Sequence, residues 1–386
     1  MQQARGLVSS PRLNCSPTRC AESAQSALGE AVNSTRGMVM IATEQRAHVG
    51  PDRRFRNPWP NSEPHGLRAV LQWTLQRRSQ ALATSPPRGS FPATSPAIVY
   101  PRAPATDFSA TWIGHSTVLL QIGGLNVLTD PVFSQRAFPV QWMGPRRVMD
   151  PGLAIDALPP LDIVVLSHNH YDHLDRSAVK RIAAAHPRTR WIVPLGLGAY
   201  IRGWGARDIV ELDWWQESAA HGLRATATPA RHFSNRRLGD RNRSLWCGFA
   251  LELDGKHAYF AGDTAYHPQF TEIGARCGPF DFVMIPIGAY DPRWFMERVH
   301  VDPEEAVRIY VDLMAPHPEA PSPLMLAVHW GTFRLTDEPM EEPPRRTVTR
   351  WRDAGLEEDR LWIARFGETR PVGRPEEPTG RRGEDP

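Results

Sequence analysis

The segment VVLSHNHYDHLD, residues 164–175, places three histidines and two aspartates directly after an apolar run. The run 163–166 is β-branched or large and apolar throughout, which is typical of a strand buried on both faces. The residues after it have the spacing H-x-H-x-D-H: His168, His170, Asp172 and His173. Alternate residues of an extended backbone point to the same side, and imidazole and carboxylate groups suit Zn²⁺ and similar ions. The segment therefore predicts a metal site at the end of a buried strand, with enough ligands to coordinate two ions.

Three later segments each lead from a short apolar or β-rich stretch to one residue that can bind a metal. ATATPARHF leads to His232, HAYFAGDT leads to Asp263, and LMLAVHWGT leads to His329. Ligands at strand ends are well positioned, because the sheet is rigid and the loop beyond it is exposed. A single histidine after a strand is more often a surface residue than a ligand. We therefore assign these residues to the site because the H-x-H-x-D-H cluster requires partners from elsewhere in the chain.

The order of strand-like and helical segments predicts an α/β fold in the layered, α+β sense. Short strand-like segments such as DIVVLSH, RWIVP, FDFVMIPIG and LMLAVHW alternate with helical patterns at 175–186 and 302–315. The second helical pattern has a clear start, because Asp302 suits the N-cap, Pro303 suits the first helical position, and Glu305 completes a capping box. No internal repeat of fixed period is found.

Composition limits the classes of function. The net charge of +3 over 386 residues gives no argument for nucleic-acid binding, so no nucleic-acid partner is expected. The four cysteines form no CxxC pair, and no apolar run is long enough to cross a membrane, so a reducing cytoplasm is the expected compartment. We predict a disordered segment over 1–52, one hydrolase domain over 53–367, and a disordered tail rich in proline, glycine and charge over 368–386.

The segment GLRAVLQWTLQRR, residues 66–78, predicts an amphipathic helix with two possible roles. One face is apolar and the other is basic; the apolar face carries Leu67, Val70, Leu71, Thr74 and Leu75. Such a helix either packs on the domain or lies on a membrane surface. The tryptophans of DWW (213–215) and RWF (293–295) leave a similar choice between core packing and an apolar opening beside the site.

At this point the sequence resembles a known family. SHNHYDH is similar to the metal-binding motif of the metallo-β-lactamase fold, with the three later ligand positions in the expected order. Five further segments together resemble the N-acylphosphatidylethanolamine-hydrolysing phospholipases D: FRNPWP (55–60), GHSTVLLQIGGLNVLTDPVF (114–133), PARHFSNR (229–236), WFMERVHVDPEEAVRI (294–309) and HWGTF (329–333). The resemblance runs from about residue 53 to about residue 367. It departs from the mammalian pattern at Val299, where those enzymes carry glutamine, and this bears on the lipid preference.

The resemblance implies an αββα sandwich with two Zn²⁺ ions at the edge of its two sheets. His168, His170 and His232 would hold one ion, Asp172, His173 and His329 would hold the other, and Asp263 would bridge the two. Three residues would act in catalysis: Asp172, His300 and His115. His300 matches a histidine implicated in substrate handling, with a hydrogen-bonding role ahead of a helix as its alternative. For His115, a direct role and a role in supporting a ligand both stay open.

The activity implied is that of a zinc-dependent phosphodiesterase that converts N-acylphosphatidylethanolamine-like lipids to phosphatidic acid and N-acylethanolamine. Its partner would be a phospholipid or another small-molecule substrate, with peripheral contact to a membrane and with a homodimer as the associated oligomeric state. A lactonase or another small-substrate hydrolase of the same fold is the alternative. A metal-binding protein without turnover is a further alternative, which the complete ligand set disfavours, and a nuclease would need a basic surface or an RNA-binding arm.

Overall fold

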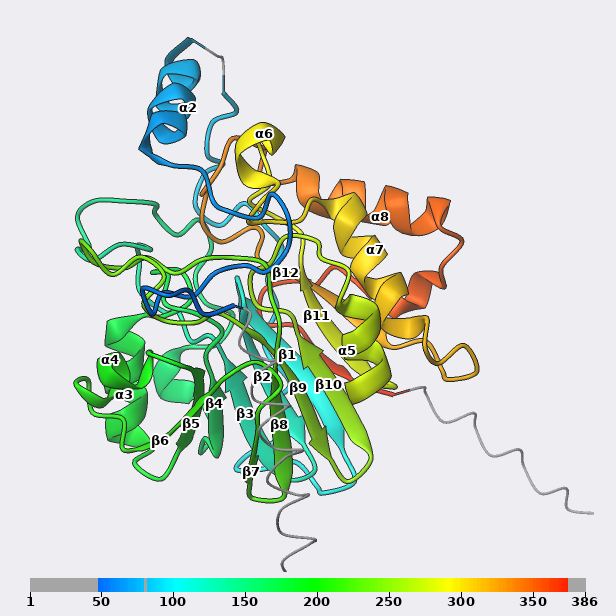
Figure 1. Ribbon diagram of the computed structural model, residues 1–386. Helices are drawn as coiled ribbons and strands as arrows, with labels where there is room; N and C mark the ends of the chain where they lie inside the picture. Colours follow the sequence, from blue (N-terminus) through cyan, green and yellow to red (C-terminus); the bar gives the residue numbers. More distant parts are fainter. Residues whose placement is uncertain (1–47, 80–81, 374–386) are drawn as a thin grey trace, which may run out of the picture. The chain divides into compact units, whose positions relative to one another are not determined.

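Two seven-stranded sheets face each other in the structure, which is a computed structural model that describes residues 48–79 and 82–373. The first sheet has the order β14-β1-β2-β3-β4-β5-β6 and the second has the order β13-β12-β11-β10-β9-β8-β7. In Figure 1, helices α3 and α4 lie on one side of the two sheets, and α5, α7 and α8 lie on the other. The predicted αββα sandwich is therefore confirmed.

The strands of the first sheet are β1 (Phe108–Gly114), β2 (Thr117–Ile122), β3 (Leu125–Thr129), β4 (Ile163–Val165), β5 (Arg190–Pro194), β6 (Asp208–Leu212) and β14 (Thr369–Pro371). Those of the second are β7 (Glu217–Ala220), β8 (Leu223–Thr228), β9 (Gly248–Leu253), β10 (Lys256–Phe260), β11 (Phe282–Pro286), β12 (Leu324–Val328) and β13 (Leu361–Trp362). Strands β3 to β6 are parallel, as are β10 to β13. Loops that follow these strands therefore leave each sheet at one edge.

The helices are α2 (Leu67–Ser79), α3 (Arg176–Ala185), α4 (Gly198–Arg202), α5 (Phe270–Cys277), α6 (Arg293–Met296), α7 (Pro303–Met314) and α8 (Glu342–Asp353), with short 3₁₀ turns at Ile155–Ala157 and Glu358–Arg360. The start of α7 confirms the predicted capping box. Asp302 accepts from the backbone N–H of Glu305 at 2.9 Å, and Glu305 accepts from the backbone N–H of Asp302 at 3.2 Å. Pro303 occupies the start of the helix, where its missing N–H costs nothing.

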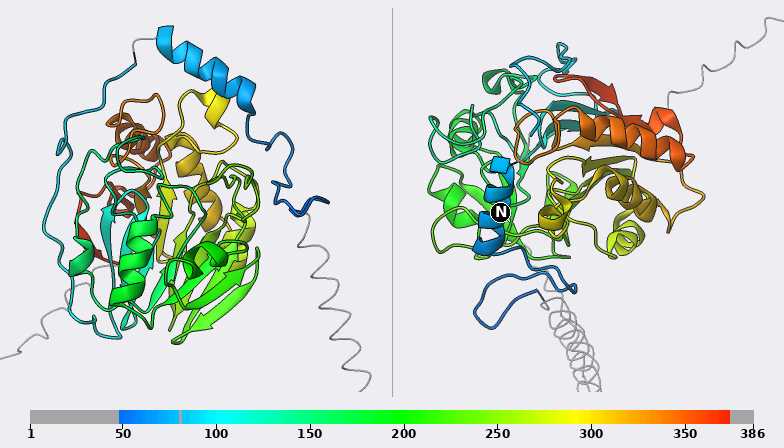
Figure 2. Two further views of the ribbon diagram at one scale, coloured as in Figure 1. Left: turned by 90° about the vertical axis from the view of Figure 1, so that its left-hand side faces the viewer. Right: turned by 90° about the horizontal axis from the view of Figure 1, so that it is seen from above.

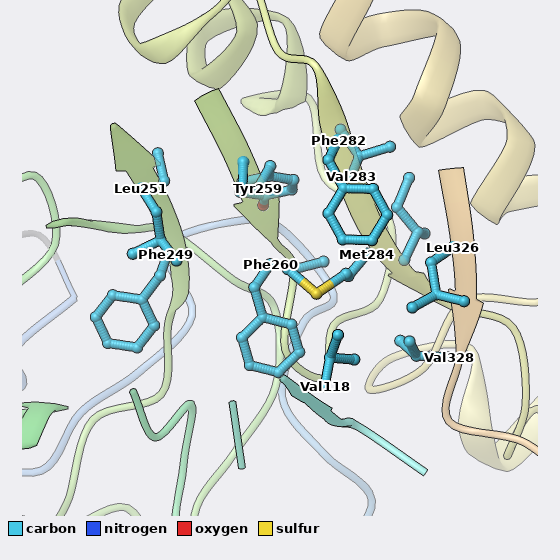
Figure 3. Close-up of a cluster of buried hydrophobic side chains, with 14 of the residues drawn as sticks. Val118, Phe249, Leu251, Tyr259, Phe260, Phe282, Val283, Met284, Leu326 and Val328 are labelled. Carbon is cyan, nitrogen blue, oxygen red and sulfur yellow. The ribbon is translucent and has the colours of Figure 1, made fainter. Parts of the chain in front are cut away.

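The main core lies between the two sheets. Val118 and Leu120 on β2 face the second sheet, whereas Leu119 faces the layer that contains α3, as the two-residue period of a strand requires. Figure 3 shows Val118 among Phe260, Met284 and other side chains of the second sheet. Since β4 is buried on both faces, the continuous apolar run that precedes the H-x-H-x-D-H motif is explained.

The structured chain extends beyond the predicted domain of 53–367 at both ends. Strand β14, which lies within the predicted tail, pairs with β1, and Thr369 lies 2.8 Å from Thr111 between their hydroxyl oxygens. At the other end, buried His48 lies 2.6 Å from a carboxylate oxygen of Asp213. These short stretches gain backbone and side-chain partners that composition does not reveal. The rest of the predicted disorder, 1–47 and 374–386, lies outside the described residues.

Helix α2 forms where the pattern predicts it but packs through a different face. Trp73 donates to a carboxylate oxygen of Asp337 at 2.5 Å and packs on the ring of Phe295 at 4.9 Å. The apolar side chains of Val70, Leu71 and Leu75 are exposed. Of the two roles left open for this helix, packing on the domain is therefore observed through Trp73, whereas contact with a membrane stays a prediction. Figure 2 shows α2 from two further directions. No helix among the described residues is long and apolar enough to cross a membrane.

Candidate metal centre

The predicted site residues all lie in loops, most of them directly after a strand. The H-x-H-x-D-H segment follows β4, His232 follows β8, Asp263 follows β10, and His329 follows β12. His115 occupies the turn between β1 and β2, and His300 lies between α6 and α7. The structure brings these residues together from both sheets, so the site belongs to the sandwich as a whole.

The Asp263 carboxylate lies at the middle of the cluster. Its Oδ2 atom is within 4.0 Å of the Nε2 atoms of five histidines: His173 at 3.1 Å, His329 at 3.2 Å, His168 and His232 at 3.8 Å, and His300 at 4.0 Å. The Oδ1 atom of the same carboxylate is buried without a hydrogen-bond partner among the described residues. One carboxylate with a free oxygen among five imidazoles is an arrangement that can serve two ions.

The first group consists of His168, His170 and His232. Nδ1 of His170 lies 2.9 Å from Nε2 of His168 and 3.1 Å from Nε2 of His232. The other nitrogen of two of these rings has its own partner: Nδ1 of His168 lies 2.9 Å from the Ser167 hydroxyl, and Nδ1 of His232 lies 2.8 Å from the Val299 carbonyl. With N–H groups at these positions, the facing nitrogens of His168 and His232 carry lone pairs. Lone pairs that converge in this way fit a bound cation.

The second group consists of Asp172, His173 and His329, and His115 joins it. Oδ2 of Asp172 lies 3.6 Å from Nε2 of His173, 3.4 Å from Nε2 of His329, and 3.1 Å from Nε2 of His115. The Nε2 atoms of His173 and His329 are buried and have no hydrogen-bond partner within residues 48–79 and 82–373. The residues therefore fit a second cation, and His115 contacts a carboxylate of this group directly.

Burial and charge set the protonation states of the site. Burial lowers the pKa of His170 to about 3 and that of His232 to about 4, so both rings are neutral at physiological pH. Burial alone would raise the pKa of Asp263, but neighbouring imidazoles, His173 and His329 first among them, hold it well below its usual range. Burial likewise opposes protonation of His329, yet Asp263 and Asp172 raise its pKa to about 9. The two carboxylates therefore favour positive charge on the imidazoles beside them, a charge that a bound cation would supply in place of the protons.

One important residue is missing from the sequence prediction. Oδ2 of Asp130 accepts from Nδ1 of His173 at 2.6 Å and from the Ser167 hydroxyl at 2.5 Å, while Oδ1 accepts from the Ser167 backbone N–H at 2.7 Å. The first contact fixes the His173 ring, so that its Nε2 atom faces the site. Asp130 follows β3 in the stretch LNVLTD, the same strand-then-acid pattern that identified Asp263.

Three residues of the site have left-handed backbone conformations that side chains rarely adopt. The φ angles are 54° for His115, 62° for His329 and 28° for Asp130. Such conformations persist where surrounding contacts determine them, and they are frequent at functional sites. The His329 N–H donates to the His115 carbonyl at 3.1 Å, which ties two of these turns together.

Known proteins resemble this chain in sequence and in fold. The family model described as "Beta-lactamase superfamily domain" matches residues 125–330. An uncharacterized protein of Mycobacterium tuberculosis is 44% identical over 281 residues, which cover 72% of this chain and 72% of the relative. N-acyl-phosphatidylethanolamine-hydrolyzing phospholipase D 1 of Caenorhabditis elegans is 39% identical over 255 residues, 64% of this chain and 70% of the relative. The solved structure of Igni18, a metallo hydrolase from Ignicoccus hospitalis, is similar with a TM-score of 0.51 and 18% identity, over 70% of this chain and all of that one.

The chain belongs to the beta-lactamase superfamily and is a hydrolase with the metallo-β-lactamase fold. Within this class it resembles N-acylphosphatidylethanolamine-hydrolysing phospholipase D, as the sequence motifs predict. Membership implies metal ions, and the His and Asp clusters supply groups that could hold them.

Asp130→Asn tests how the site is supported. The amide cannot match the charge of the carboxylate that accepts from His173, so we expect metal affinity to fall about 10- to 100-fold. Titration of the purified protein with a chelator, followed by elemental analysis, measures this. Asp162→Asn is the matched control. Asp162 is also a buried carboxylate, directly before β4, but it pairs with Arg102 and not with a residue of the site. Equal metal retention by both variants would remove Asp130 from the support of the site.

Proposed function

We propose that this chain is a zinc-dependent phosphodiesterase of the phospholipase D type. It hydrolyses N-acylphosphatidylethanolamine-like lipids to phosphatidic acid and N-acylethanolamine. The observation that carries this proposal is the pair of side-chain clusters around the Asp263 carboxylate, in a chain 39% identical to a protein named for that reaction. The two clusters support two ions, and the identity supports the substrate class.

In this proposal, His168, His170 and His232 hold one zinc, while Asp172, His173 and His329 hold the other. Asp263, whose carboxylate lies among the histidines of both groups, would serve both ions. When bound, such ions polarise a phosphate oxygen and lower the pKa of a coordinated water, which makes a nucleophile available at neutral pH. Histidine and carboxylate ligands without thiolate are compatible with this choice of metal.

The remaining side chains position the substrate and its protons. His300 is buried, and its Nδ1 atom has no hydrogen-bond partner in the part of the chain that the structure describes. Its ring centre lies 5.0 Å from that of His232, so it can donate to a phosphate oxygen at the edge of the cluster. His115 contacts Asp172 at 3.1 Å and orients that carboxylate. In the reaction, an oxygen from water bonds to phosphorus, the bond from phosphorus to the ethanolamine oxygen breaks, and the released alkoxide takes a proton.

A lipid substrate also needs an apolar surface on the protein, and α2 carries exposed apolar side chains. The helix rests on Phe295 and Asp337, and these residues lie in the two segments that carry His300 and His329. Arg77 supports the same contact, with its Nε atom 2.9 Å from a carboxylate oxygen of Asp337. The exposed side chains of Val70, Leu71 and Leu75 therefore belong to a helix that is anchored on these two segments. We infer that α2 makes the peripheral membrane contact.

The tryptophans divide between core and surface. Trp214 is buried in the core and donates to the Trp246 carbonyl at 2.7 Å, so it does not line an opening. Trp294 is half-buried against the rings of His65 and Phe295. The lactonase alternative has no comparable use for an exposed apolar helix. The homodimer stays a prediction.

Metal content tests the dinuclear site. Protein purified without chelator should carry close to two zinc ions per chain, because two separate groups of side chains share one carboxylate. Asp263→Asn should lose at least one ion and most of the turnover, since the amide cannot balance two cations. Asp254→Asn, in an exposed turn, is the control and should keep both ions. One tightly bound ion in the unsubstituted protein would contradict the dinuclear site.

Product analysis tests the reaction. With N-acylphosphatidylethanolamine in mixed micelles, phosphatidic acid and N-acylethanolamine should appear in equal amounts. In ¹⁸O-labelled water the label should enter the phosphoryl group, because the water oxygen attacks phosphorus. Label in a free fatty acid would indicate ester hydrolysis instead. Turnover of a soluble lactone, with no turnover of the lipid, would favour the lactonase.

Leu71→Gln/Leu75→Gln tests the role of α2. Leucine burial in a bilayer is worth kilocalories per side chain, so we expect hydrolysis of vesicle-presented substrate to fall by about tenfold or more. Initial rates with vesicles measure the effect. Val311→Gln, at an exposed apolar position on α7, is the control and should have no such effect. Equal rates for both variants would separate α2 from the lipid surface.

A further inference from the structure

A pocket of about 430 Å³ lies next to the candidate metal centre but is lined by other residues. It is formed by the loop 134–141, the start of α3, Trp204 and the pair Arg236 and Arg237. Tyr171, which lies between His170 and Asp172 in the sequence, is part of its wall. Arg176 and Lys180 of its lining belong to α3, which lies beside α4 in Figure 1. The pocket and the metal centre therefore share one loop.

The lining of this pocket is strongly cationic. It contains five basic side chains: Arg136, Arg176, Lys180, Arg236 and Arg237. Asp175 is the one acid among the lining residues, and its carboxylate already accepts from the backbone N–H groups of Phe133, Ser134 and Ser177. None of the five cations forms an ion pair with a carboxylate of residues 48–79 or 82–373. Their mutual repulsion is relieved when an anion enters the pocket.

Arg236 gives the pocket a fixed point. Its Nη1 atom donates to the carbonyl of Leu174 at 2.7 Å and to that of Asn169 at 3.0 Å. Its guanidinium carbon lies 4.0 Å from the centre of the Tyr171 ring and 5.1 Å from that of Trp204. The charge is thus held in place by the aromatic wall, and less side-chain entropy is lost when an anion binds.

Large apolar side chains flank the cations on both loops. Trp142, just past the loop 134–141, is 75% exposed, and its neighbour Met143 is 45% exposed. Leu238, directly after Arg237, is fully exposed. Exposed apolar residues beside basic residues match a bilayer interface, where the apolar groups insert and the cations meet anionic headgroups. This combination distinguishes a lipid surface from a soluble anion as the partner.

We propose that this pocket binds the phosphate of an anionic phospholipid, with Trp142 and Leu238 inserted in the same bilayer. The bound lipid is not the substrate; it holds the domain at the surface from which the metal centre takes its lipid. The inference rests on the proposed function in one respect: it assumes that the metal centre takes its substrate from a bilayer. Docking itself requires no turnover.

Vesicle sedimentation with the full chain, metal included, tests the proposal. Vesicles of phosphatidylcholine alone are compared with vesicles that also contain phosphatidylglycerol, and neither contains N-acylphosphatidylethanolamine. We expect tighter binding to the anionic vesicles, weakened by added salt. Arg176→Gln/Lys180→Gln should weaken that binding about tenfold or more, since each basic group adds to the attraction. Trp142→Ala should weaken binding to both kinds of vesicle.

Arg345→Gln/Arg350→Gln on α8 is the matched control, because it removes the same charge from two exposed helical positions outside the pocket. An equal loss of vesicle binding in both double variants would show that net charge alone causes the effect, and it would overturn the pocket as the binding site. Binding of inorganic phosphate by calorimetry, without preference for anionic vesicles, would overturn the lipid as ligand. Metal content and thermal unfolding verify that each variant is folded, and Arg237→Gln, at an exposed loop position, provides a second variant. If the vesicles do not bind, the products formed in mixed micelles can still confirm the proposed reaction. If N-acylphosphatidylethanolamine is not hydrolysed, binding to anionic vesicles can still be observed.

Discussion

The structure depends on gathering a buried carboxylate and several imidazoles at one point between two sheets. Such groups are costly to bury unless a cation or hydrogen bonds compensate them. The carboxyl-terminal edges of parallel strands provide the rigid support: β4 brings His168 from one sheet, while β10 and β12 bring Asp263 and His329 from the other. The packing between the sheets therefore sets the distances within the site, such as the 3.2 Å between Asp263 Oδ2 and His329 Nε2. A substitution that disturbs the packing between the sheets is therefore expected to disturb the metal centre as well.

The motifs outside the ligand set have a structural explanation in the same terms. Asn57, in FRNPWP, donates through its side-chain amide to the carbonyl of His232 at 2.9 Å. Arg293 donates to the carbonyl of His300 at 2.9 Å and pairs with Glu305, which belongs to the capping box of α7. The backbone carbonyls of both histidines are thus fixed by hydrogen bonds from side chains outside the ligand set. Support of this kind limits ring movement and preserves the geometry on which metal affinity depends.

The sequence predicts the layered fold and brings the right residues to the site, because both depend on local patterns. An apolar strand followed by His or Asp is visible in a short window, as is the capping box of α7. The short strands β13 and β14 are not predictable in this way, since they are defined by partners far along the chain. Asp130 was missed although its strand-then-acid pattern is present, because its contact with His173 exists only in the folded chain.

Helix α2 shows the same limit for a surface. Its periodicity predicts a helix correctly but leaves open whether the apolar stripe packs on the domain or faces outward. The structure shows the helix held through Trp73 on Phe295 and the ion pair between Arg77 and Asp337, with Val70, Leu71 and Leu75 exposed. Local pattern thus gives the element, and tertiary contact decides which face is offered to the surroundings.

Substrate choice follows from these surroundings more than from the metal centre. A cluster of this kind can polarise a lactone carbonyl as well as a phosphate oxygen, so its donor set does not discriminate between the two. Discrimination has to come from groups that contact the rest of the substrate or its carrier surface. The candidates for such groups are the exposed apolar side chains of α2, a helix anchored on the segments of His300 and His329, and the cationic pocket that shares the loop of His170 and Asp172. If both contact a bilayer, as we propose, a phospholipid in that bilayer would meet both and a soluble lactone neither, and this difference would favour the lipid as the substrate.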